Sequence, residues 1–245
     1  MRIYHTLKIG EYHTNYCEDY LINCEIGHQK MLCAVMDGCS MGTDSHLAST
    51  LTGKILRKIS SGLSYQEFIS KEAPGLSKLM ENVIRQLFSE LRTIKNTLLL
   101  QREELLSTLV IAIIDTENCS GEFLCVGDGL ICINGQYFEF EQNDQPDYLG
   151  YHLEEDFEQW IENQHQKISV EHITDFSIST DGIFTFKKFD EGIYEQPDNI
   201  VDYLLVDNTG SATEMMLHKK VIDIESEWGL KPADDIAIIR GIYNP

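Results

Sequence analysis

Two aspartates of this chain follow apolar stretches and stand directly before a glycine, in Asp37-Gly38 and Asp181-Gly182. Because glycine lets the backbone turn at once, each carboxylate and the Gly38 carbonyl can face a ligand at the edge of a sheet. Further acids stand at comparable strand ends, namely Glu18, Asp19, Asp128, Asp234 and Asp235. Carboxylate oxygens suit Mg²⁺ or Mn²⁺, whereas zinc favours histidine or cysteine. The pattern therefore predicts a divalent metal centre on which these acids converge.

The same dipeptides have a second interpretation. Asp-Gly is a common turn sequence, so each pair taken singly is better explained as a turn than as a metal ligand. Clustered carboxylates repel one another unless cations neutralise them, so a cluster and a metal imply each other. The spacing does not match a calcium-binding EF-hand loop, and the sequence has no Gly-rich phosphate loop. An acidic interaction module whose Asp-Gly pairs are only turns stays open at this point.

Other reaction chemistries find little support in the sequence. The seven cysteines include no Cys-x-x-Cys pair of the kind that binds zinc or carries redox chemistry. Cys33, Cys125 and Cys132 stand inside apolar runs, which favours buried structural thiols in a reducing compartment. Because the N-terminus has no signal-peptide core and no apolar run reaches membrane-spanning length, the sequence predicts a soluble, cytoplasmic protein.

The charge balance restricts the partners of the protein. Forty acidic residues against 19 lysines and arginines give a formal net charge of −21. This charge opposes non-specific binding to nucleic acid or to anionic membranes and favours a partner with a cationic face. The length of 245 residues fits one large domain or two small ones, and only five prolines argue against long linkers. We expect a single domain over residues 1–245.

The carboxylates must be positioned by strands and helices that the apolar pattern predicts. Strands are expected over residues 3–9, 19–25, 31–36, 107–115, 121–126, 130–133, 136–140, 173–179 and 235–240. Asn134-Gly135 indicates a type I′ hairpin. Helices are expected from residue 44 or 45 to about residue 60, over residues 64–69 and 76–94, and over residues 200–206 and 212–228.

The order of these elements predicts the fold class. We expect the strands between residues 107 and 140 to form one meander, with a tight turn at residues 127–129. Residues 141–172 show only one amphipathic stretch, around residues 153–161, and this segment is not placed. Because strands occur in blocks between helix pairs, the pattern favours α+β layers over alternating βαβ units.

Six short motifs occur in an order that resembles the metal-dependent protein phosphatase 2C family, across nearly the full chain. They are residues 15–19 (NYCED), 35–38 (VMDG), 107–108 (ST), 126–128 (VGD), 179–182 (STDG) and 233–236 (ADDI). The resemblance implies a four-layer α-β-β-α sandwich, in which two antiparallel sheets are flanked by helix pairs. It also implies a centre of two Mn²⁺ or Mg²⁺ ions at one end of the sandwich. Asp37 would bridge both ions, and the Gly38 carbonyl would bind one of them.

The resemblance assigns roles to the other acids. Asp181 and Asp234 would bind the second ion, with Glu18 or Asp19 holding it directly or through water. Asp128 matches the position that, with Asp181, binds a third and weaker ion in relatives. Two such ions generate hydroxide from a bridging water near neutral pH and orient a phosphate monoester for in-line attack, so that no covalent intermediate is needed.

The chain also departs from the family pattern. The family places an arginine that clamps the phosphate four residues before the Glu18 position, and here that residue is Thr14. The neighbouring His13, like His46 farther on, is better explained by a structural or surface role than by phosphate binding. Residues 39–42 (CSMG) lack the histidine that eukaryotic relatives offer as a general acid, and Asp128 is followed by Gly-Leu in place of Ser-Arg. Residues 141–172 would occupy the flap region.

The resemblance thus implies a Mn²⁺- or Mg²⁺-dependent phosphatase that hydrolyses phosphoserine or phosphothreonine in a protein substrate, with a cognate kinase as its counterpart. The alternative is a catalytically weak or inactive phosphatase-like protein that binds a phosphoprotein or a regulatory partner. Thr14 in the arginine position motivates this alternative. The retained acids argue against it, because an inactive protein does not need them.

Overall fold

The computed structural model describes residues 1–70, 74–141, 147–190 and 199–243. Two five-stranded sheets face each other, and every strand pair in them is antiparallel. Sheet A has the order β1 (Arg2–Lys8), β12 (Ile236–Ile242), β9 (Asp175–Ser179), β6 (Gly129–Ile133) and β7 (Gln136–Phe140). Sheet B has the order β2 (Tyr20–Gly27), β3 (Lys30–Met36), β4 (Leu109–Asp115), β5 (Ser120–Val126) and β8 (Lys167–Val170).

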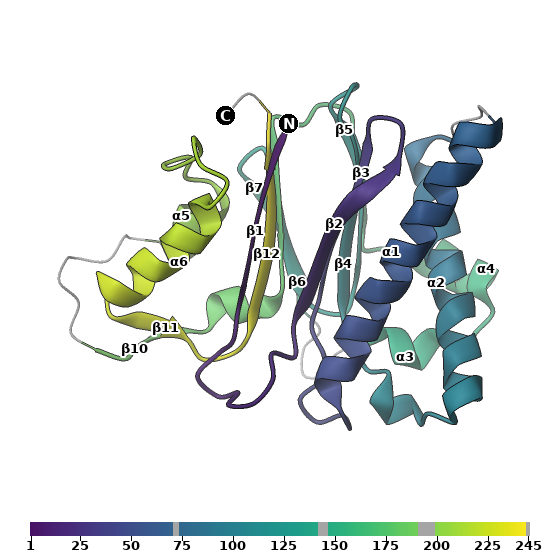
Figure 1. The fold of residues 1–245 in the computed structure, drawn as a ribbon, viewed down its shortest axis with the longest axis horizontal. Helices are drawn as coiled ribbons and strands as arrows, with labels where there is room; N and C mark the ends of the chain where they lie inside the picture. Colours follow the sequence, from purple (N-terminus) through teal and green to yellow (C-terminus); the bar gives the residue numbers. More distant parts are fainter. Residues whose placement is uncertain (71–73, 142–146, 191–198, 244–245) are drawn as a thin grey trace.

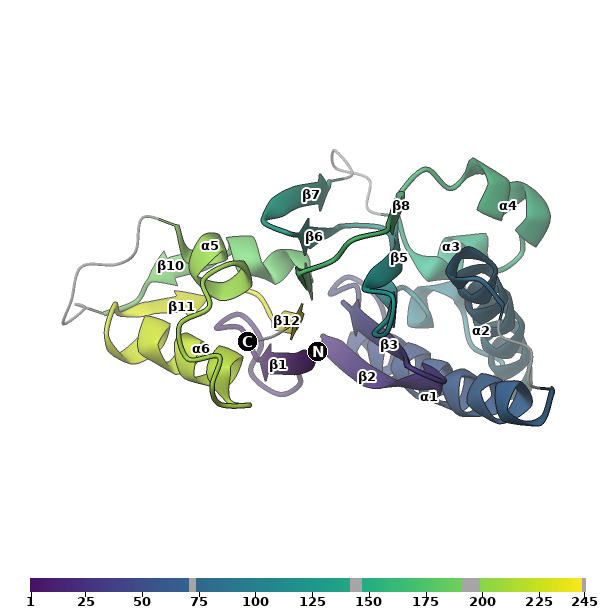
Figure 2. The same cartoon turned by 90° about the horizontal axis from the view of Figure 1, so that it is seen from above.

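Helices cover the outer face of each sheet, so the molecule has four layers (Figures 1 and 2). Helices α1 (Ser45–Ser70) and α2 (Leu76–Leu98) lie on sheet B, and helices α5 (Ile200–Leu205) and α6 (Met216–Ser226) lie on sheet A. The predicted α+β fold, an α-β-β-α sandwich of two antiparallel sheets flanked by helix pairs, is confirmed. No helix in the described part of the chain is long and apolar enough to cross a membrane.

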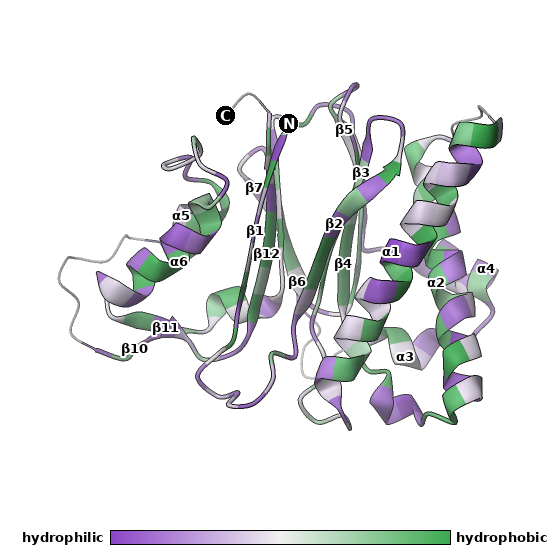
Figure 3. Ribbon diagram, in the orientation of Figure 1, coloured by the Kyte–Doolittle hydropathy of each residue, from purple (hydrophilic) through white to green (hydrophobic). Residues whose placement is uncertain are grey.

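The core has three apolar layers, which explains why the central strands read as continuous apolar runs (Figure 3). In β3, Cys33 and Val35 point into the layer between the sheets, while Leu32 and Met36 pack toward α1 and α2. A strand that is buried on both faces needs apolar residues at every position. The acids at the ends of such strands therefore mark the point where the chain leaves the core.

The expected helix end near residues 60–62 is wrong, because α1 continues without a break to Ser70. The hydroxyl of Ser60 donates to the Glu25 carbonyl at 2.5 Å, and that of Ser61 donates to the Arg57 carbonyl at 3.0 Å. Both serines thus bond without opening the helix. Burial of Leu63 continues the apolar face and offsets the low helix propensity of Gly62, which follows the two serines.

The expected meander is also wrong. Strands β4 and β5 belong to sheet B, whereas β6 and β7 belong to sheet A, so residues 127 and 128 carry the chain from one sheet to the other. Gly127 makes this crossing with a φ of 86°. Because β5 and β6 are both buried on two faces, their apolar patterns do not reveal which strand each will pair with. The hairpin at Asn134-Gly135 is confirmed, with φ values of 52° and 79°.

Several short elements were not expected. Strand β8 completes the edge of sheet B, and β10 (Phe186–Lys188) pairs with β11 (Leu230–Pro232) as a separate two-stranded ribbon. Within the segment that was not placed, α3 (Leu149–His152) and α4 (Phe157–Asn163) pack their apolar residues against α2. The expected flap therefore includes helices of the outer layer, and its residues 142–146 lie outside the described chain. Two single helical turns also occur, η1 (Arg102–Glu104) and η2 (Asp181–Phe184).

Candidate metal centre

The pairing of β2 with β3 brings the first two acids together. Tyr20 lies opposite Met36, so Asp19 and Asp37 extend from the same end of sheet B. Their side chains share a hydrogen bond, and Asp19 is only 3% exposed. The carboxylate of Asp19 also accepts a hydrogen bond from Thr180 Oγ1 at 2.6 Å. Since Thr180 directly follows β9 of sheet A, this hydrogen bond joins the end of sheet B to the end of sheet A.

Four carboxylates line a hollow of about 230 Å³ at this end of the sandwich: Asp37, Asp128, Asp181 and Asp234. They come from the end of β3, the crossing between β5 and β6, the end of β9, and the approach to β12. The other lining residues are Cys39, Ser40, Met41, Thr108 and Tyr148. None of these lining residues, all within the described chain, is a lysine, arginine or histidine. The hollow therefore holds negative charge without a cationic side chain of its own.

Burial and mutual repulsion alter the titration of these acids. Burial, together with the charges of Asp19 and Asp181, holds the pKa of Asp37 well above its usual range. Burial likewise raises the pKa of Asp19, against the hydrogen bonds from Thr180 and Asp37 that favour its charged form. The pKa of Asp181 rises to about 6, because surrounding atoms displace water from it and because Asp234 and Asp128 lie near. Each shift has the sign that burial and neighbouring negative charges produce.

The chemistry of this donor set fits a hard divalent cation, because the hollow is lined by carboxylate oxygens and, among the described residues, by no lysine, arginine or histidine. From outside this lining, His13 Nδ1 lies 3.7 Å from Asp234 Oδ1. In the described ranges of the chain, no group of three or more His, Cys, Asp and Glu side chains is arranged to hold a metal ion. The four carboxylates instead line the wall of the hollow. Mutual repulsion opposes a closer approach of these carboxylates, and a bound cation would offset that repulsion.

Backbone contacts hold the Asp37-Gly38 turn in place. The Thr108 amide donates to the Asp37 carbonyl at 2.8 Å, and the Asp37 amide donates to Thr108 Oγ1 at 3.2 Å. A Cβ atom on Gly38 would lie 2.1 Å from the Ser45 carbonyl oxygen, so only glycine lets the start of α1 pack this closely. The Gly38 amide donates to the Glu18 carbonyl at 3.2 Å. The Ser-Thr motif thus positions Asp37.

Glu18 lies apart from the four carboxylates. Its side chain accepts hydrogen bonds from Ser40 Oγ at 2.8 Å and Ser45 Oγ at 2.5 Å. It lines a second, neighbouring hollow of about 340 Å³, together with Thr14 and His46. The structure therefore brings Asp37, Asp128, Asp181 and Asp234 together, attaches Asp19 through a hydrogen bond, and sets Glu18 and Thr14 to one side.

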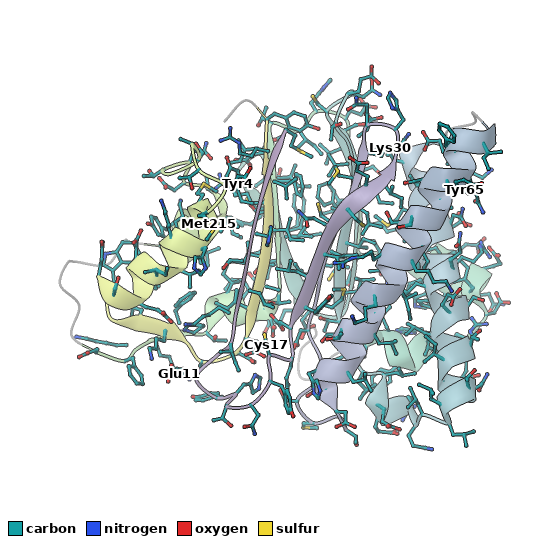
Figure 4. The ribbon with its side chains drawn as sticks, viewed as in Figure 1. Tyr4, Glu11, Cys17, Lys30, Tyr65 and Met215 are labelled. Carbon is teal, nitrogen blue, oxygen red and sulfur yellow. The ribbon has the colours of Figure 1, made fainter. Side chains whose placement is uncertain are left out.

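Two further residues organise this end of the molecule. Asp235 is 2% exposed, accepts hydrogen bonds from the Gly10 amide at 2.7 Å and from the Glu18 amide, and forms an ion pair with His13, whose Nδ1 lies 2.9 Å from its carboxylate. Burial lowers the pKa of His13, but the hydrogen bond and charge of Asp235 outweigh this effect and raise it. The pair fixes the loop of residues 10–18, whose Glu11 and Cys17 lie at the end of the sandwich opposite Lys30 (Figure 4). In the sequence, the doublet Asp234-Asp235 was the only sign that an acid at this position organises the loop.

The two histidines discussed from the sequence have structural contacts. His13 bonds Asp235, as described, and His46 stacks on Tyr16 with a ring-centroid separation of 4.3 Å and an interplanar angle of 9°. Both histidines line the second hollow, beside Thr14. Neither hollow has an arginine among its lining residues, all of which are described.

Known proteins share this architecture. A structure of RsbX in complex with magnesium is 15% identical, with a TM-score of 0.55 over 97% of this chain and 92% of that chain. The phosphatase Stp1 from Staphylococcus aureus is 13% identical, with a TM-score of 0.62 over 100% and 96%. A bacterial serine phosphatase bearing a single mutation is 12% identical, with a TM-score of 0.66 over 100% and 99%.

At identities this low, the similarity to these structures establishes only that the fold is shared. A search of the curated proteins finds no match to this sequence. A family model described as protein phosphatase 2C matches residues 11–207, a range that contains Glu18, Asp37, Asp128 and Asp181 but ends before Asp234. Since the match covers most of the sequence, the chain belongs to the protein phosphatase 2C family.

Proposed function

We propose that this protein is a Mn²⁺- or Mg²⁺-dependent phosphatase that hydrolyses phosphoserine or phosphothreonine in a protein substrate, with residues 1–245 acting as one domain. The observation that carries the proposal is the hollow lined by Asp37, Asp128, Asp181 and Asp234, where the ends of both sheets meet. Members of the protein phosphatase 2C family are metal-dependent protein phosphatases, and carboxylates gathered without a cationic side chain are what such ions require.

We assign the ions to Asp37, Asp181 and Asp234, with Asp128 for a weaker third ion and with the Gly38 carbonyl as a further donor. Bound divalent ions supply the charge that activates a water molecule and orients a phosphate ester. The contribution of the chain is to hold the ligands. Asp19 orients Asp37 through their shared hydrogen bond and is itself fixed by Thr180. Glu18 supports the first turn of α1 through Ser45 and stands ready for a contact through water.

Phosphate binding differs from the family pattern under this proposal. Thr14 is exposed on the wall of the second hollow, and the nearby His13 is occupied by Asp235. With no arginine lining either described hollow, the grip on the phosphate falls to the ions themselves. We therefore expect a high KM for small phosphate esters, which bring no other contacts to the surface.

Hydrolysis of an aryl phosphate and of a phosphothreonine peptide with Mn²⁺ tests the proposal. We expect turnover that requires the metal and that falls at least about 100-fold in Asp37→Asn and in Asp181→Asn, since even supporting residues at metal sites cost 10–100-fold. Glu117→Gln is the matched control, because Glu117 is exposed in the turn between β4 and β5. Equal rates in the wild type and in all three variants would sink the proposal.

A second candidate is a phosphatase-like protein that binds a phosphoprotein or regulatory partner with little or no turnover. The specific observation that favours it is Thr14 in the place of the phosphate-clamping arginine. Calorimetry with Mn²⁺ distinguishes the candidates. Metal binding that Asp37→Asn abolishes, without hydrolysis of either substrate, supports the second candidate. Absence of any Mn²⁺ binding contradicts both and leaves the Asp-Gly pairs as turns.

A further inference from the structure

The ribbon of β10 and β11 is formed by the two chain segments that also supply Asp181 and Asp234 to the hollow. Strand β10 follows the helical turn that begins at Asp181, and β11 ends two residues before Asp234. The loop of residues 10–13 runs alongside β11, with the Glu11 amide donating to the Pro232 carbonyl at 3.0 Å and the Tyr12 amide donating to the Ala233 carbonyl at 2.9 Å. Figure 1 shows this ribbon at the same end of the sandwich as that loop.

Three aromatic side chains on or near the ribbon of β10 and β11 are exposed. Tyr12 is 70% exposed, Phe189 is 63% exposed and Phe184 is 46% exposed. Phe184 belongs to the same helical turn as Asp181, and Tyr12 lines the hollow that also contains Glu18. A group of exposed apolar side chains at the rim of a site often marks a surface that binds a partner.

Two lysines stand among these rings. Lys187 of β10 lies directly opposite Lys231 of β11. Lys231 pairs with Glu11 at 2.8 Å, and its Nζ lies 4.1 Å from the Phe189 ring centroid. The Nζ of Lys187 instead donates to the Tyr12 hydroxyl at 2.8 Å and lies 5.0 Å from that ring.

The two lysines differ in the charge of the groups that they contact. Within the described ranges, Lys187 has no carboxylate at ion-pair distance, so its charge is held by an aromatic ring and a hydroxyl that are both neutral. This lysine stands on a protein of net charge −21, and the neighbouring hollow is lined by four carboxylates. An anionic substrate that approaches this end meets attraction at Lys187 and repulsion from most of the remaining surface.

We propose that this surface, formed by Tyr12, Phe184, Lys187, Phe189 and Lys231 and here called the ribbon face, binds the peptide that flanks the phosphorylated residue and favours acidic side chains in it. The proposal rests on the phosphatase function of the neighbouring hollow and names the class of its substrate.

The chain itself sets the reach of this surface. Lys231 precedes Asp234 by three residues, a span of at most about 10 Å. An extended peptide advances about 3.3 Å per residue. A side chain two to four residues from a phosphoresidue in the hollow therefore reaches the ribbon face. The aromatic rings contact the peptide, and Lys187 selects among sequences by charge.

The test compares two phosphothreonine peptides that differ only in the residues flanking the phosphoresidue, with Asp and Glu in one and Asn and Gln in the other. The readout is the ratio of their kcat/KM values with Mn²⁺. We expect wild type to prefer the acidic peptide and Lys187→Glu to lower that ratio about tenfold, equivalent to the ~1.4 kcal/mol by which charge reversal replaces attraction with repulsion. Lys187→Arg should keep the preference, and 0.5 M salt should shrink it.

Lys219→Glu is the matched control, because Lys219 is an exposed lysine of α6. An unchanged ratio in Lys187→Glu, or an equal drop in Lys219→Glu, overturns the inference. Hydrolysis of an aryl phosphate by the wild type separates this failure from failure of the phosphatase function. Fluorescence anisotropy with the same two peptides, labelled, tests the ribbon face even without turnover: weaker binding of the acidic peptide to Lys187→Glu supports it, and equal binding to both proteins overturns it.

Discussion

Arg240 and Lys220 lie buried between sheet A and its helices, while Asp19 and Asp37 meet at the end of sheet B. Arg240 is 0% exposed and donates to the Val206 carbonyl at 2.6 Å, the Asp207 carbonyl at 2.7 Å and the Asp175 carboxylate at 3.2 Å. Lys220 is 2% exposed and also bonds Asp207, through its carbonyl and its carboxylate. This basic cluster meets the cost of burial with local partners.

The acidic cluster of Asp19 and Asp37 has no such oppositely charged partners nearby in the described part of the chain. Asp19 is as buried as Lys220, but the charged groups nearest to it are other carboxylates, those of Asp37, Asp181 and Asp235. In the sequence Arg240 and Asp37 look alike, because each follows directly on an apolar run. The difference teaches that a buried charge with its own partners supports the scaffold, whereas one surrounded by like charges indicates a ligand supplied from outside.

Removal of Arg240 should have the largest effect on this comparison. Arg240→Met leaves the carbonyls of residues 206 and 207 and the Asp175 carboxylate buried without their cation, so we expect a loss of about 3–5 kcal/mol in the free energy of unfolding. Urea denaturation followed by circular dichroism measures it. Arg57→Met is the control, since Arg57 is exposed on α1 and should change stability by less than about 0.5 kcal/mol. A similar loss in both variants contradicts the contrast.

The Lys220 position should respond less. Lys220→Met keeps the aliphatic stem but removes the donor to the Tyr203 and Asp207 carbonyls. The Asp207 side chain is 42% exposed and can turn to water, so the expected loss is about 1–2 kcal/mol. The neighbouring variant Lys219→Met should be neutral in the same urea titration. A Lys220→Met protein as stable as wild type would show that the basic cluster depends on Arg240 alone.

The acidic cluster should respond with the opposite sign. An amide at residue 19 can accept from Thr180, donate to Asp37 and carry no charge, so in EDTA we expect Asp19→Asn to raise stability by up to about 1 kcal/mol. The same variant should lose most of the stabilisation that Mn²⁺ gives to wild type. Thermal melts in EDTA and in Mn²⁺ measure both effects. Asp175→Asn, which weakens the partner of Arg240, should be destabilised in either solution, and a matching response of the two variants breaks the comparison.

His152 provides an intermediate case with the smallest expected effect. Its ring lies 2.6 Å from Asp147 and 3.0 Å from Glu155. Burial lowers the pKa of His152, but these two acids outweigh burial and raise it. A raised folded pKa gives stability that is complete below the unfolded value of about 6.5 and is lost as pH rises through the folded value. His152→Gln should therefore cost about 0.5–1 kcal/mol at pH 5.5 and little at pH 9. A constant cost across that range contradicts this reading.

Much of the fold followed from the sequence, because apolar periodicity and turn residues act locally. The strands over residues 19–25 and 31–36 were predicted, as was the hairpin at Asn134-Gly135. The length of α1 was not, since serine hydroxyls bond their own helix as readily as they end one. The crossing between the sheets at Gly127 was not predicted, because the sequence of a strand that is buried on both faces does not reveal which strand it pairs with.

The candidate site was predicted only in outline. The acids were identified by their positions at strand ends, but the sequence does not specify which way a side chain points. Glu18 therefore lies in the second hollow, and of the Asp-Asp doublet Asp234 lines the first hollow while Asp235 binds His13. Such a contact joins residues from opposite ends of the chain, and no local pattern encodes it.

The position of β12 has a consequence for biosynthesis. Strand β1, which is synthesised before the other strands of sheet A, lies at the edge of that sheet beside β12, which is synthesised after them. Strand β1 must wait almost the full length of the chain for its neighbour, and Asp234 arrives together with that neighbour. A growing polypeptide thus carries an incomplete set of carboxylates until translation of these strands is finished.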